Sequence, residues 1–141
     1  MNIIQLPNNK KFIFIIICFF IQIFAYAQTQ KGSDIDGEAM ENRSGWSVSM
    51  PDANTVAIGA YENDGTGRDA GHVRVYRWSG SSWVQKGSDI DGEAAYDYSG
   101  YSVSMPDANT VAIGAPYNNG GTASNAGHVR VYSWSGSSWV Q

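Results

Sequence analysis

Acidic residues with the spacing of a cation site occur twice in this chain. Asp34, Asp36 and Glu38 alternate with small or apolar residues, and the stretch 88–93 repeats the same sequence. Grouped carboxylates are oxygen ligands that Ca²⁺ prefers, but the stretch lacks the further ligands and the distal glutamate of an EF-hand loop. We interpret it as a solvated connection whose Asp side chains cap turns, with Ca²⁺ binding at Asp34, Asp36 and Glu38 as the alternative.

A second acidic stretch, 62–69, is rich in glycine, and its counterpart 117–122 has lost the acidic residues. A metal site that the fold requires is expected in both copies, whereas a flexible turn need not keep its acids. The stretch also lacks the Lys-Ser/Thr ending of a phosphate-binding loop, and no helix is expected after it. We therefore interpret it as a turn.

His72 and His128 begin equivalent segments, and Arg74 and Arg130 follow them two positions later. A hydrolytic triad needs Ser, His and Asp in one asymmetric cluster. Because both histidines recur at the same place of a repeat, we expect packing or hydrogen-bonding roles for them. The two arginines are expected between repeats. The sequence thus predicts no catalytic, cofactor-binding or metal-binding residue, and no enzyme.

Five tyrosines lie at or near the ends of predicted loops, where an aromatic ring can stack on a sugar or a peptide side chain. They are Tyr61, Tyr96, Tyr98, Tyr101 and Tyr117. The second interpretation, which carries equal weight, is that these rings fill interfaces between repeats. The loops 40–43 and 95–98 differ most between the copies, so binding specificity is expected there.

These residues belong to an internal repeat with an offset of 55, which grows to 56 after the loop that follows Ala115. From 31 to 60, 25 of 30 positions match the second copy. The differences fall in polar or Gly-rich segments that are expected to be loops. We assign repeat 1 to residues 30–84 and repeat 2 to residues 85–141.

Each repeat predicts four short strands. In repeat 1 the first alternates apolar residues with serines, and the second is short, β-branched and nearly all apolar. Pro51 to Asn54 form the expected turn between them. Trp78 and Trp83 flank a later turn and are expected to pair across two strands. The predicted strands of repeat 1 are 45–50, 55–60, 72–78 and 82–85.

Four short antiparallel strands repeated at this spacing are typical of a β-propeller blade. The predicted fold class is therefore all-β, with two four-stranded antiparallel blades. A blade buries its faces against its neighbours, and propellers typically have about 4–8 blades, so two blades form an incomplete propeller. Two alternatives stay open: a truncated fragment of a longer chain, or a natural short form that completes a ring as a homo-oligomer.

Three short motifs occur in the same order in repeat 2. Gly100-Tyr101 places an aromatic residue beside glycine, 114–116 reads Gly-Ala-Pro, and 127–132 reads Gly-x-Val-x-Val-Tyr. In this order they resemble the FG-GAP repeat, the blade of integrin α-subunit propellers and of many bacterial surface proteins. The first motif has its two residues swapped, and repeat 1 has Tyr61 in place of the proline.

The resemblance implies an extracellular recognition or adhesion module. Members of this family often carry a Ca²⁺ loop with several carboxylates between the FG strand and the GAP strand. Here residues 105–109 fill that place with one carboxylate, Asp107, which cannot supply the six to eight oxygens that Ca²⁺ takes. The family's metal site is therefore not carried over to this chain.

The N-terminus has the three parts of a secretory signal peptide. Lys10 and Lys11 precede an apolar run from Phe12 to Phe24, and Ala25-Tyr26-Ala27 forms an A-x-A site. We predict that 1–27 is a signal peptide cleaved after Ala27, which leaves no membrane span; an uncleaved anchor is the alternative. The only cysteine of the chain, Cys18, would leave with it.

The formal net charge of −4 leaves no basic stripe for nucleic acid. We expect an exported, non-catalytic recognition or adhesion module, secreted or at the cell surface, that binds a glycan or a protein through its loops. The alternatives are a fragment of a propeller-fold extracellular hydrolase or lyase, and a purely structural repeat without a ligand.

Overall fold

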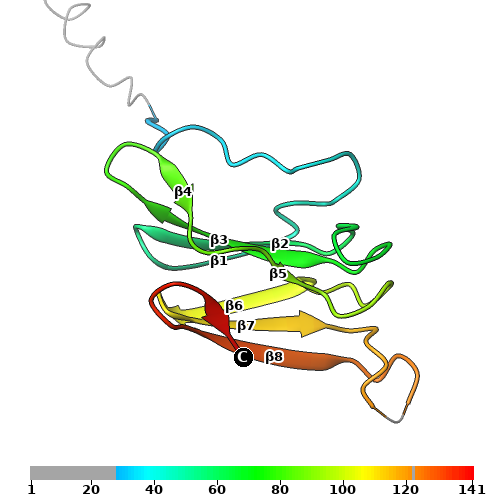
Figure 1. Cartoon of the computed structure of the whole chain (residues 1–141). Helices are drawn as coiled ribbons and strands as arrows, with labels where there is room; N and C mark the ends of the chain where they lie inside the picture. Colours follow the sequence, from blue (N-terminus) through cyan, green and yellow to red (C-terminus); the bar gives the residue numbers. More distant parts are fainter. Residues whose placement is uncertain (1–27, 122) are drawn as a thin grey trace, which may run out of the picture. The chain divides into compact units, whose positions relative to one another are not determined.

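The computed structural model describes residues 28–121 and 123–141 (Figure 1). The predicted signal peptide, 1–27, lies outside the described residues. Lys31–Gln141 form one compact unit. In the part of the chain that is described, no helix is long and apolar enough to cross a membrane.

The unit contains two antiparallel sheets with the same strand order (Figure 1). Blade 1 consists of β1 (Ser47–Asp52), β2 (Thr55–Ala60), β3 (His72–Trp78) and β4 (Trp83–Gln85), and a short strand, β5 (Ile90–Asp91), also pairs with β3. Blade 2 consists of β6 (Ser102–Asp107), β7 (Thr110–Ala115), β8 (His128–Trp134) and β9 (Trp139–Val140). The predicted all-β fold with two four-stranded antiparallel repeats is confirmed, and the two blades do not close a ring.

The first hairpin of each blade turns two residues later than the sequence predicts. The predicted strand 45–50 is observed as β1 at Ser47–Asp52, and the turn is confined to Ala53 and Asn54. Pro51 is tolerated inside β1 because this strand is at the edge of its sheet, where a missing N–H breaks no ladder. The Asn54 N–H donates to Asp52 Oδ1 at 2.6 Å, which closes the turn.

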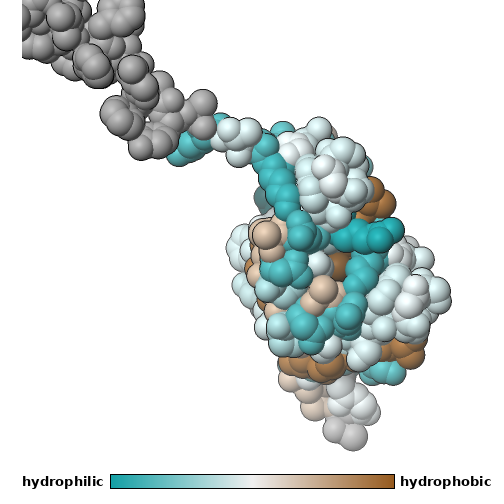
Figure 2. All heavy atoms as spheres, turned by 90° about the vertical axis from the view of Figure 1, so that its left-hand side faces the viewer, coloured by the Kyte–Doolittle hydropathy of each residue, from teal (hydrophilic) through white to brown (hydrophobic). Residues whose placement is uncertain are grey.

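The two blades lie face to face (Figure 1). Each blade has two faces. The face that carries the serines of the first strand and the valines of the third strand is called the B face, and the opposite face is called the A face. The B face of blade 1 packs on the A face of blade 2, with β1 against β6. The buried core consists of Ala57, Val73, Val75, Ile90, Met105, Val111, Ile113 and Tyr132. Hydrophobic residues also reach the surface in the lower part of Figure 2, on the side of blade 2 away from blade 1.

A pair of tryptophans closes the outer end of each blade. Trp78 and Trp83 meet edge to face with ring centroids 5.4 Å apart, so the predicted pairing is confirmed. Lys31 Nζ lies 5.0 Å from the Trp78 ring centroid, and the Trp83 indole N–H donates to the Lys31 carbonyl at 2.9 Å. The repeat places Lys86 against Trp134 and Trp139 in the same way. These contacts fasten the connection in front of each blade to its outer edge.

Candidate functional site

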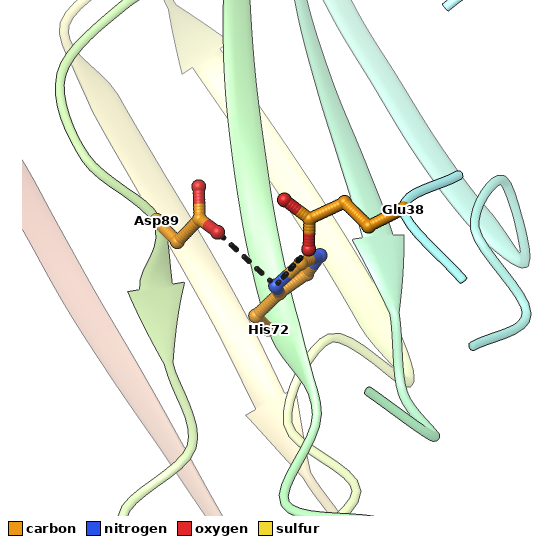
Figure 3. A group of neighbouring side chains, drawn as sticks. All are labelled: Glu38, His72 and Asp89. Atoms are coloured by element: carbon orange, nitrogen blue, oxygen red, sulfur yellow. Dashed lines mark ion pairs between the residues drawn. The ribbon is translucent and has the colours of Figure 1, made fainter. Parts of the chain in front are cut away.

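The structure brings only one of the three predicted cation ligands, Glu38, into a cluster. Within the described residues, Glu38, His72 and Asp89 form the one group of at least three acidic, histidine or cysteine side chains whose ligand atoms all lie within 4.8 Å of one another. Figure 3 shows the two carboxylates approaching the imidazole from two sides. His72 Nδ1 lies 3.5 Å from Asp89 Oδ2 and 3.9 Å from Glu38 Oε2.

The Glu38 carboxylate of this group is already in contact with a cationic side chain and a hydrogen-bond donor. Arg74 Nη1 is 3.2 Å from Glu38 Oε1, and Arg74 Nη2 donates to the Asp36 carbonyl at 3.0 Å. The Asn63 amide also donates to Glu38 Oε2 at 3.3 Å. A buried guanidinium at this distance repels a metal cation and competes for the same carboxylate. The contacts fit a structural role, in which the connection 31–38 is fastened to β3.

His72 is fully buried, with 1% of its surface exposed. Burial lowers the pKa of its imidazole, while the neighbouring Asp89 partly offsets the effect and Arg74 adds to it. The expected hydrogen-bonding or packing role fits this environment. In blade 2, His128 Nδ1 lies 3.7 Å from Glu93 Oε2, so the pairing of this histidine with a glutamate recurs in the second repeat.

The two arginines have different surroundings. Arg130 is buried on the A face of blade 2, where it lies between the blades as expected, and Nη2 donates to the Asp91 carbonyl at 2.6 Å. Arg74 occupies the same place on the A face of blade 1, but there it contacts the connection before the blade instead of another blade.

The acidic loop 62–69 is an ordered turn in the structure. Asp64 Oδ1 accepts a hydrogen bond from the Asp69 N–H at 2.8 Å, and Asn63 Oδ1 accepts one from the Gly65 N–H at 2.8 Å. Asn119 and Asn118 make the equivalent bonds in blade 2. Since an Asn replaces Asp64 without loss of the bond, the carboxylate serves the turn geometry.

Four of the five predicted tyrosines gather into one cluster together with Trp46. This aromatic cluster is formed by Trp46, Tyr61, Tyr98, Tyr101 and Tyr117. The ring centroids are 5.0 Å apart for Trp46–Tyr61, 5.3 Å for Tyr61–Tyr101, 5.6 Å for Tyr61–Tyr98 and 5.3 Å for Tyr98–Tyr117. Trp46 and Tyr61 come from blade 1 and the other three from blade 2, so the cluster spans the junction between the blades.

The cluster surrounds a shallow cavity of about 310 Å³, which is lined by Tyr61, Glu62, Tyr98, Tyr101 and Tyr117. Its rings stay accessible: Trp46 is 54% exposed, Tyr117 50% and Tyr101 43%. Glu62 forms an ion pair with Arg43 at 2.9 Å at the rim. The rings pack at the blade junction and still face solvent. The cluster is therefore compatible with both interpretations of the tyrosines, ligand stacking and filling of the interface between repeats.

The loops 40–43 and 95–98 set the backbone at the rim. Arg43 and Tyr98 are equivalent in the repeat, and both have a positive φ, of 56° and 55°. The Tyr98 N–H donates to the Asp69 carbonyl of blade 1 at 3.2 Å, which holds the loop of blade 2 against its neighbour. A positive φ is uncommon for such side chains. Its recurrence at Arg43 indicates that the repeat itself imposes this backbone.

The phenols of Tyr61 and Tyr98 are protonated at neutral pH. Partial burial among the neighbouring rings raises the pKa of Tyr61, and the Glu62 carboxylate raises it further. Partial burial likewise raises the pKa of Tyr98. Protonated phenols can donate and accept hydrogen bonds, so the cavity offers aromatic faces together with neutral polar groups.

The sequence interpretation missed three members of this site and included one residue that lies outside it. Tyr96 stacks against Arg68, with 6.0 Å between the guanidinium carbon and the ring centroid, and is not part of the cluster. Trp46 could have been found from its alignment with Tyr101 at the offset of 55. Arg43 and Glu62 align with Tyr98 and Tyr117 in the same way.

In comparisons with known proteins, no protein-family model matches the chain, and no curated protein matches it.

Proposed function

We propose that this chain is an exported, non-catalytic recognition module of FG-GAP-like propeller blades whose aromatic cluster binds a glycan. The observation that supports this most is the convergence of four tyrosines on one solvent-facing cavity at the blade junction, with Trp46 packed against Tyr61 and Tyr101. Exposed aromatic rings held in place by one another present flat apolar faces at low entropic cost, which suits the apolar face of a sugar ring.

The polar groups at the rim favour a neutral, hydroxyl-rich ligand. Arg43 and Glu62 form an ion pair, so the carboxylate in the cavity wall is already compensated. An aromatic cage for a cationic ligand would use an uncompensated carboxylate and the faces of the rings. Paired charges and phenol hydroxyls instead supply the donors and acceptors that sugar hydroxyls need.

The cavity volume indicates that only a small part of a ligand enters it. About 310 Å³ is at the lower end of the roughly 300–1,000 Å³ that is common for small-ligand sites. A terminal sugar or a short saccharide fits this volume, whereas a long chain would extend over the rim. A protein ligand that inserts one side chain into the same cavity is the second candidate, and the outcome of the test below separates the two.

The glycan proposal is tested by glycan-array binding with the protein purified after expression of the full chain. Tyr101→Ala removes a central ring and is expected to weaken binding at least about tenfold, as truncation of a binding hot spot does. Tyr96→Ala is the matched control, since Tyr96 is another exposed tyrosine, 51% against 43% for Tyr101, and lies outside the cluster. Circular dichroism checks that both variants keep their strand signal.

Four outcomes would count against the proposal. Absence of any glycan signal would refute a glycan ligand, and peptide binding that Tyr101→Ala abolishes would assign the cluster to a protein. Equal losses in Tyr101→Ala and Tyr96→Ala would show that the cluster is not the site. Turnover of a polysaccharide or ester by the purified protein would favour the hydrolase or lyase alternative.

A further inference from the structure

The two end faces of the blade pair have the composition of the interface between the blades. Inside the molecule, Val73 and Val75 on the B face of blade 1 are 0% and 1% exposed because blade 2 covers them. Their equivalents on the B face of blade 2, Val129 and Val131, are 66% and 51% exposed. This face is where Figure 2 shows hydrophobic residues in its lower part.

The A face of blade 1, at the opposite end, likewise exposes residues whose equivalents are buried between the blades. Met105 on the A face of blade 2 is 5% exposed, whereas its equivalent on blade 1, Met50, is 53% exposed. Val48, the neighbour of Met50 on this face, is 54% exposed. Exposed apolar groups that are contiguous and have buried equivalents in the same molecule mark an unfilled interface.

The polar groups of the internal interface are also present on the free faces. Ser47 Oγ donates to the Gly100 carbonyl at 2.6 Å, and Ser49 Oγ accepts from the Met105 N–H at 2.9 Å. Their equivalents on the B face of blade 2, Ser102 and Ser104, are exposed. The free B face therefore offers both the apolar surface and the hydroxyls that bind an A face.

Gly59 at the internal interface also has an equivalent on the free B face, Gly114. A Cβ at Gly59 would collide with the Gly100 carbonyl of blade 2, so the blades can approach only because position 59 is glycine. Gly114 is the equivalent residue on the free B face, and there the three atoms nearest to an added Cβ all belong to Ser102 in the same blade. The free face thus already has the glycine that a close partner requires.

We infer that the B face of blade 2 binds the A face of blade 1 of a second copy of this chain, in head-to-tail order. The occupant is a second copy because its free A face carries the residues that fill this B face inside the chain. Two different faces make a heterologous contact, which closes into a ring if the rotation permits and otherwise grows as a filament. A propeller of about 4–8 blades would take two to four copies.

The test measures the solution mass of the protein purified after expression of the full chain, by light scattering over a range of concentrations. The wild type is expected as an assembly of several chains. Val131→Asp and Met50→Asp each place a charge in one half of the contact, and each is expected to weaken self-association by about 100-fold or more. Ser137→Asp is the control, because Ser137 is an exposed turn residue outside both faces.

Mixing the two charged variants tests the orientation. Val131→Asp keeps an intact A face and Met50→Asp keeps an intact B face, so the equimolar mixture is expected to give a dimer that grows no further. This dimer also demonstrates that both variants are folded, and Val131→Lys replaces Val131→Asp if circular dichroism shows loss of strand signal.

Several results would overturn the proposal. A monomeric wild type at all concentrations would leave both faces to another partner. A stable dimer of Val131→Asp alone would indicate an isologous contact between equal faces, and a monomeric mixture of two folded variants would exclude the head-to-tail contact. Loss of the assembly in Ser137→Asp would show that any added charge disrupts it.

Discussion

Trp46 and Tyr101 occupy equivalent positions of the two repeats, and their rings meet with centroids 5.7 Å apart. Each ring belongs to a different blade, and the contact exists only because the blades are stacked. The aromatic cluster is therefore a property of the junction and not of a single repeat. An isolated repeat would present only a part of it.

Trp46 should report ligand binding through its fluorescence. The other four tryptophans of the chain form the pairs at the outer ends of the blades, and Trp46 is in contact with Tyr61 and Tyr101. A saccharide that stacks on Tyr61 and Tyr101 in the cavity changes the surroundings of this indole, which contacts both rings, and leaves the outer pairs unchanged. Titration of the wild type with a glycan that binds on the array is expected to shift or quench its emission.

Trp46→Phe keeps an aromatic ring at this place and removes the reporter. We expect it to bind the same glycan with an affinity within a fewfold of the wild type and to give no fluorescence response. A full response in Trp46→Phe would place the ligand beside one of the outer tryptophan pairs and contradict the assignment of the site.

Gly59→Ala should destabilise the protein, because the added methyl group collides with the Gly100 carbonyl across the blade junction. Overpacking of this kind costs about 1–3 kcal/mol, and a backbone obstacle cannot be relieved by a rotamer change. The loss is expected in the free energy of unfolding, measured by urea denaturation with circular dichroism.

Gly114→Ala is the matched control for this loss. It makes the same change at the equivalent strand position, where no other blade is present, and its main obstacle is the Ser102 hydroxyl, which can rotate. At protein concentrations too low for self-association, we expect a cost well below that of Gly59→Ala. Equal costs would mean that the strand, and not the blade junction, requires glycine.

The strand segments of this fold follow from local sequence to a large extent. Residues 55–60 and 72–78 were predicted with the observed bounds, because β-branched and aromatic residues between turn signals leave few alternatives. The first strand was misplaced by two residues, since Pro51 reads as a turn residue unless its edge position is known. The two-residue strand β5 was missed because it exists only through its pairing with β3.

The buried face and the site depend on contacts that local sequence does not contain. The segments of β1 and β6 are identical in sequence, yet Met50 is exposed and Met105 buried, because only Met105 has a blade against it. In the same way, the sequence identifies the tyrosines as loop residues. Their contact with Trp46 depends on the stacking of the two blades. The pairing of Asp89 with His72 likewise comes from the next repeat.

His72 should give the protein a pH-dependent stability in mildly acidic solution. Its pKa in the folded protein is lowered, chiefly by burial, so the unfolded chain binds a proton more readily than the folded one. Stability is then fully present above the unfolded pKa of roughly 6.5 and falls as the pH drops toward the lower folded value. The slope from one such group is at most about 1.4 kcal/mol per pH unit.

His72→Gln removes this proton-binding group and keeps a polar side chain of similar size. The free energy of unfolding, measured by urea denaturation between pH 7 and pH 5, is expected to fall less steeply in the variant than in the wild type. His128→Gln is the control, because it removes the equivalent imidazole and leaves His72 in place, so the contribution of His72 to the slope should persist. A His72→Gln curve parallel to the wild type would refute the role of this imidazole in the acid sensitivity of the protein.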